Sequence, residues 1–107
     1  MKLLAAITTV ENIEDARRIA KAAIETKLAA CAQFESIGSV YRWNGQTVEA
    51  TEVRITFKTT DSRWPELRSY ILSMHPYELP ELCALELTEV NASYLQWVAA
   101  TTDCISQ

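Results

Sequence analysis

The spacing of apolar residues changes several times along the chain, and each change indicates a new element. Residues 2–9 form an apolar, β-rich run that predicts a first strand. Asn12 then offers a helix N-cap, with Asp15 three residues on, and apolar residues recur at helical spacing from there to Lys27. The pattern therefore predicts a strand followed by a helix.

An extended segment over residues 29–43 leads into a predicted hairpin. Its apolar residues change parity midway, which indicates a β-bulge near residues 36–38. Asn44-Gly45 is a strong signal for a two-residue type I′ turn, because both residues tolerate a positive φ. Apolar and polar residues then alternate over 52–58, so the returning strand has one face on a core and one on water or a partner.

A second helix follows, with Asp61 or Ser62 as its expected cap and Pro65 in its first turn. The dipeptide His75-Pro76 ends it, because the residue before a proline avoids the helical region. Its apolar face carries Leu67, Tyr70, Ile71 and Met74.

Residues 82–90 predict a fourth strand and residues 92–101 a short third helix, with Asn91 or Ser93 as cap. We expect Leu95 and Val98 to face inward. The resulting order, β-α-β-β-α-β plus a terminal helix, is typical of the ferredoxin-like α+β sandwich. We therefore expect one domain over residues 1–107, with two helices on one sheet face and no obvious cover on the other.

The predicted hairpin is long for so small a domain. A strand of about 13 residues reaches about 43 Å, whereas a domain of this length is about 34 Å across. Unless it bends, the hairpin overhangs its own domain and carries Tyr41 and Trp43 near its tip. Exposed aromatics of this kind favour a subunit interface, although the two rings could also stack across the hairpin.

Composition narrows the range of partners. The chain holds 10 Lys+Arg against 14 Asp+Glu, a formal net charge of -4, which disfavours nucleic acid and anionic membranes and favours cations. No apolar run is long enough to span a membrane, and the N-terminus lacks the features of a signal peptide, so we expect a cytoplasmic protein. Cys31, Cys83 and Cys104 lack CxxC spacing, which predicts reduced, buried thiols.

The most chemically dense segment is residues 75–81, which presents His75, Tyr77, Glu78 and Glu81 between two prolines. Proline stiffening suits a ligand site, but the same residues could simply end a helix and turn the chain. His75 with Glu78 and Glu81 is the candidate metal set, and it needs further donors from elsewhere. The sequence contains no recognised nucleophile-base motif and no Gly-rich phosphate loop, so we expect neither an enzyme nor an organic cofactor.

Five separated motifs resemble the CutA divalent-cation tolerance family and occur in the family's order. They are KLAACA at 27–32, SVYRWNG at 39–45, KTT at 58–60, HPYELPE at 75–81 and YLQW at 94–97. The resemblance implies a ferredoxin-like homotrimer that takes part in the response to copper, as Cu(II), or to other divalent ions. It also implies copper ligands at a cysteine in the first strand and at a His-His pair before Pro-Tyr. Those positions hold Thr8, Met74 and His75 here.

Two other functions fit the same element order. The first is a trimeric signalling or scaffold protein similar to the PII proteins, which binds a small effector without a metal in clefts between subunits. Such a cleft could be lined by Tyr41, Trp43, Tyr77 and Trp97. The second is single-stranded RNA binding, as in the RRM. It ranks last, because that function needs stacking aromatics on the central strands in a basic setting.

Overall fold

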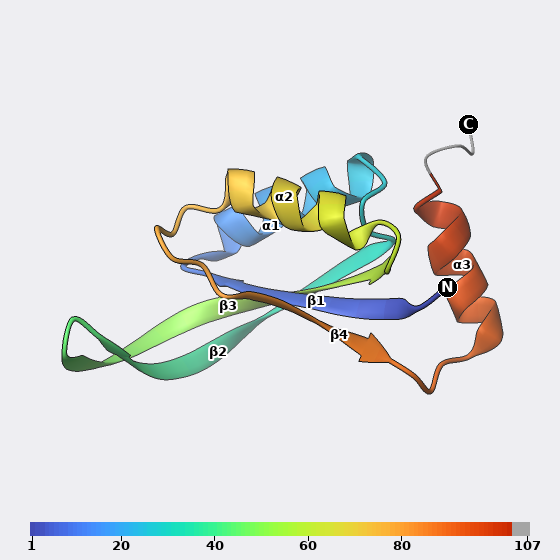
Figure 1. Ribbon diagram of the computed structural model, residues 1–107. Coiled ribbons are helices and arrows are strands. Elements are labelled where there is room, and N and C mark those ends of the chain that lie inside the picture. Colours follow the sequence, from blue (N-terminus) through green and yellow to red (C-terminus); the bar gives the residue numbers. More distant parts are fainter. Residues whose placement is uncertain (104–107) are drawn as a thin grey trace.

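The computed structural model describes residues 1–103, which form one antiparallel sheet with helices on one face and at one end (Figure 1). The strands lie in the order β2-β3-β1-β4, so the predicted ferredoxin-like α+β arrangement is confirmed. The elements are β1 (Leu3–Val10), α1 (Ile13–Glu25), β2 (Cys31–Trp43), β3 (Gln46–Thr60), α2 (Trp64–Met74), β4 (Leu82–Leu87) and α3 (Ala92–Thr101).

The hairpin of β2 and β3 is longer than the rest of the sheet, and its pairing is unbroken. Cys31 lies opposite Lys58, and the register continues residue by residue to Trp43 opposite Gln46. The expected bulge near residues 36–38 is therefore wrong. Figure 1 shows the outer half of the hairpin projecting beyond the helices. No helix of residues 1–103 packs on that half, so its apolar residues need not lie on one face. The change in parity thus reflects the end of the core rather than an inserted residue.

The tip of the hairpin is the predicted type I′ turn. Asn44 has a φ of 51° and Gly45 a φ of 75°, and both values lie in the left-handed region that this turn requires. The molecule measures 47 × 27 × 20 Å along its principal axes, so the predicted overhang is present. Val40 is 67% exposed and Trp43 is 45% exposed, which leaves large apolar side chains on the projecting part.

The main core lies between the sheet and the first two helices. Alternate residues of β1 and β3 point toward α1 and α2, because side chains on a strand alternate between faces. The helices contribute apolar residues at helical spacing, as the sequence predicts. The largest fully buried members are Val10, Ile19, Ile55, Phe57, Leu67 and Ile71.

Helix caps account for two of the three predicted helix starts. The Asn12 side chain accepts from the Asp15 N–H at 2.9 Å, and Asn91 caps α3 by accepting from Ser93. The expected cap of α2 is wrong, because Arg63 is its N-cap residue and makes no side-chain cap hydrogen bond. The Asp61 carboxylate instead accepts from the backbone N–H of Lys2 at 2.9 Å, which ties the start of β1 to the end of β3.

The third helix covers one end of the other sheet face. Val98 of α3 is fully buried in a second cluster with Leu3 and Ala30, and Leu95 packs against it, so both residues face inward as predicted. The fourth strand ends at Leu87, earlier than predicted, and Val90 also packs against this cluster.

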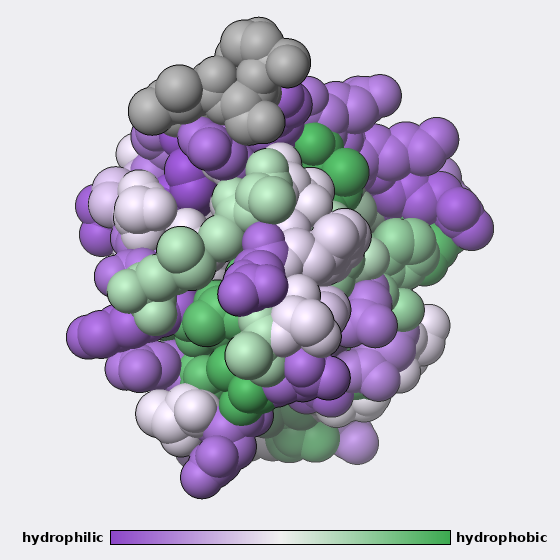
Figure 2. All heavy atoms as spheres, turned by 90° about the vertical axis from the view of Figure 1, so that its right-hand side faces the viewer, coloured by the Kyte–Doolittle hydropathy of each residue, from purple (hydrophilic) through white to green (hydrophobic). Residues whose placement is uncertain are grey.

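Beyond α3 this face is open. Leu85 on β4 and Trp97 on α3 are each 47% exposed. Figure 2 shows this end of the molecule, with apolar and weakly polar surface running between hydrophilic margins. Cys83 is exposed and Cys31 half-buried, so the expected burial of these thiols is wrong, and Cys104 lies outside the described residues. No helix within residues 1–103 is long and apolar enough to cross a membrane.

Candidate functional site

His75 fastens the segment between α2 and β4 to the end of β1. Its Nε2 lies 2.9 Å from the carbonyl oxygen of Thr9 and 3.1 Å from the hydroxyl of Thr8. Its Nδ1 accepts from the backbone N–H of Tyr77 at 3.1 Å. The Thr8 hydroxyl also donates to the carbonyl of Glu81, so this strand end holds both ends of the segment.

These contacts define the protonation state of His75. A nitrogen that accepts from a backbone N–H carries no proton, so the proton of the neutral ring resides on Nε2 and is donated to Thr9. Burial lowers the pKa of His75 below its ordinary value of 6.5, against a smaller opposing effect of the Thr9 hydrogen bond. The folded protein therefore favours the neutral ring, with both nitrogens hydrogen-bonded within the chain.

The second residue of the segment closes onto the hairpin. The Tyr77 ring lies 5.0 Å from the ring of His75, and its hydroxyl donates to the carboxylate of Glu52 at 2.9 Å. Burial and this hydrogen bond raise the pKa of Tyr77 well above its usual range, so the phenol remains a donor. His75, Tyr77 and Glu52 thus connect β1, segment 75–81 and β3.

A cleft of about 920 Å³ opens between the hairpin and segment 75–81. Its walls combine aromatic and apolar side chains with four carboxylates and a single basic residue, Arg54. The guanidinium of Arg54 is bound to Glu35 by two N–H donors, at 3.0 and 3.1 Å. The four carboxylates of the lining are those of Glu11, Glu52, Glu78 and Glu81.

Three of the four predicted aromatic residues meet in this cleft. Tyr41 and Trp43 contribute from the hairpin and Tyr77 from the facing segment. Trp97 lies on α3, where its ring is 5.7 Å from that of Tyr94, and it does not line this cleft. Tyr94 in turn contacts the Cys31 thiol at 3.5 Å, and burial together with this contact raises the pKa of Tyr94 to about 12.

The predicted metal residues do not form a complete site within one chain. Glu78 and Glu81 are exposed and line the cleft, whereas His75 uses both nitrogens internally. Among residues 1–103 no group of three or more His, Cys, Asp or Glu side chains could hold one ion. A complete set would need donors from a second subunit.

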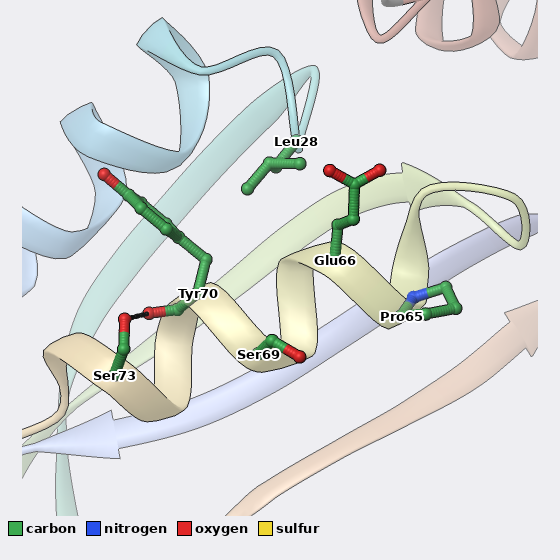
Figure 3. Close-up of a pocket in the computed structure, with 6 residues that line it drawn as sticks. All are labelled: Leu28, Pro65, Glu66, Ser69, Tyr70 and Ser73. Carbon is green, nitrogen blue, oxygen red and sulfur yellow. Dashed lines mark hydrogen bonds between the residues drawn. The ribbon is translucent and has the colours of Figure 1, made fainter.

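A separate shallow groove lies between α2 and the turn before β2 (Figure 3). Its one carboxylate, Glu66, is paired with Arg63 at 2.7 Å, and Ser73 donates to the carbonyl of Tyr70. It contains none of the predicted site residues. The predicted site residues that line a pocket therefore do so at the hairpin cleft and not in this groove.

The sequence pattern does not identify Glu52 as a site residue. Glu52 looks like an ordinary polar position in an alternating strand, yet it is only 9% exposed and its carboxylate accepts from the Tyr77 hydroxyl. Only the folded position of segment 75–81 reveals this. Thr8 and Thr9 are missed for the same reason, although the resemblance places Thr8 at a ligand position, and its contact with His75 shows that these two positions are adjacent.

The family model described as "CutA1 divalent ion tolerance protein" matches residues 4–101. The "Divalent-cation tolerance protein CutA" of Thermus thermophilus is 41% identical over 97 residues, which cover 90% of this chain and 94% of that protein. The human "Protein CutA" is also 41% identical, over 103 residues that cover 95% of this chain but only 58% of the human protein.

Solved structures of such proteins share the fold over nearly the whole chain. The CutA1 structure from Ehrlichia chaffeensis superposes with a TM-score of 0.91 at 36% identity, covering 96% of this chain and 98% of that one. The structure from Archaeoglobus fulgidus, named as a periplasmic divalent cation tolerance protein, gives a TM-score of 0.92 at 33% identity, covering 94% and 99%.

Proposed function

The chain belongs to the CutA divalent-cation tolerance family, and from this premise we propose that it is a homotrimer that binds copper or another divalent ion and takes part in the response to metal ions. The observation that carries the proposal is the carboxylate-rich cleft beside segment 75–81, in a chain with a net charge of -4. Carboxylate oxygens are common ligands of divalent cations. The family names of the relatives fit this chemistry, and no catalytic activity is proposed.

The trimer is supported by surfaces that a single chain leaves uncovered. The hairpin projects with Val40, Tyr41 and Trp43 exposed, and one sheet face carries exposed Leu85 beyond the reach of α3. Aromatic and aliphatic side chains of this kind are typical of subunit interfaces, and closed symmetric assemblies cover free sheet edges.

The proposed ligands are Glu78 and Glu81, with His75, completed by donors of an adjacent subunit. An ion bound to a nitrogen of His75 must replace one existing hydrogen bond, either from the Tyr77 N–H or to the Thr9 carbonyl. Metal binding through His75 would therefore loosen segment 75–81, whereas binding through the two carboxylates alone would not.

Isothermal titration calorimetry with Cu(II) and with Zn(II) tests this proposal. We expect weaker binding in His75→Ala and in the double variant Glu78→Gln/Glu81→Gln. Glu25→Gln, at the far end of α1, is the matched control and should bind as the unaltered protein does. Equal affinity in all four proteins would show that these residues hold no metal.

We place the protein in the cytoplasm, where free thiols such as those of Cys31 and Cys83 remain reduced. Because one related structure is named as periplasmic, subcellular fractionation of the native source is the test. Recovery with a periplasmic marker enzyme would contradict this placement.

A second candidate function is a trimeric scaffold or signalling protein, similar to PII proteins, that binds a small effector. Two features of the cleft favour this function. Its volume is larger than a bare ion needs, and its wall carries aromatic side chains. A shift of intrinsic Trp fluorescence by a metabolite in metal-free buffer would support it, because Trp43 lines the cleft.

A further inference from the structure

We draw no further inference here: the strongest candidate, the shallow groove that Leu28, Pro65 and Tyr70 line between α2 and the turn before β2, carries nothing, because its one carboxylate, that of Glu66, is already paired with Arg63 and nothing in the structure shows what would occupy it.

Discussion

At the scale of single residues, the site depends on how His75 uses its two nitrogens. Nδ1 accepts from Tyr77 and Nε2 donates to Thr9, so the ring is a neutral connector between β1 and segment 75–81. The sequence identifies His75 as the one histidine of the chain but cannot show that both nitrogens are occupied, because Thr8 and Thr9 are more than 60 residues away.

The lowered pKa of His75 predicts a pH-dependent stability. In the unfolded chain the pKa of His75 is near its ordinary value of 6.5. At a pH below 6.5 the unfolded chain therefore binds more protons than the folded chain does. The free energy of unfolding should therefore be highest above pH 6.5 and decrease as the pH falls from there through the lower folded-state pKa. Urea unfolding between pH 5 and 8 measures this, with protein concentration held constant.

His75→Gln is the control for this measurement, because it keeps a side-chain donor but does not titrate. The difference in unfolding free energy between the two proteins isolates the histidine from the carboxylates. A difference that does not change between pH 5 and 8 would contradict the assigned state of His75.

The hydrogen bond between Tyr77 and Glu52 predicts a loss of stability in Tyr77→Phe. Removing the hydroxyl leaves a carboxylate oxygen without its donor, which costs about 1–3 kcal/mol. Denaturant unfolding of Tyr77→Phe, Glu52→Gln and the double variant forms a cycle that isolates the interaction. Additive single effects would mean that the two side chains do not interact in solution.

At the scale of elements, the sequence predicts correctly those features that depend on a few neighbouring residues. Asn12 and Asn91 identify helix starts and Asn44-Gly45 the hairpin, since each acts within a few residues. The predicted bulge is wrong because the helices face only the inner half of β2, so apolar residues of the outer half need not keep the same parity. The cap of α2 fails because Asp61 binds a distant backbone group, which no local pattern encodes.

Substitution by alanine is expected to act differently at the two glycines of the hairpin. Gly45 has a φ of 75°, so Gly45→Ala should destabilise the protein by about 1 kcal/mol. Gly38 lies in regular β2 with nothing within 4 Å of an added Cβ, so Gly38→Ala should be neutral or stabilise by about 0.4–1 kcal/mol. Thermal unfolding compares the two variants, and a larger loss from Gly38→Ala would contradict the unbroken register of β2.

At the scale of the whole molecule, the sequence predicts the architecture better than the site. The 47 Å long axis and the projecting hairpin follow from strand length and turn chemistry. The grouping of Glu52 with Tyr77 follows only from the three-dimensional path of segment 75–81. Trp97 fails to join the other aromatics in one chain because α3 packs at the opposite end of the sheet.

The exposed hairpin predicts that its aromatics stabilise the assembly. Trp43 is 45% exposed in a single chain, so Trp43→Ser should leave the fold intact while weakening subunit association, as expected for a buried aromatic at an interface. Sedimentation velocity over a range of concentrations measures the effect, and Arg42→Ser, the preceding residue on the opposite face of β2, is the control. Unchanged association in Trp43→Ser would place the interface elsewhere.

We propose that this chain forms a metal-binding trimer, and native mass spectrometry measures subunit number and bound ions in one experiment. The protein is titrated with Cu(II) and with Zn(II) beside a metal-free sample, so subunit number and bound ions are read together. We expect three subunits that take up ions in equal number per subunit, with uptake reduced in His75→Ala. A monomer, or a trimer that binds no ion at saturating metal, would contradict it.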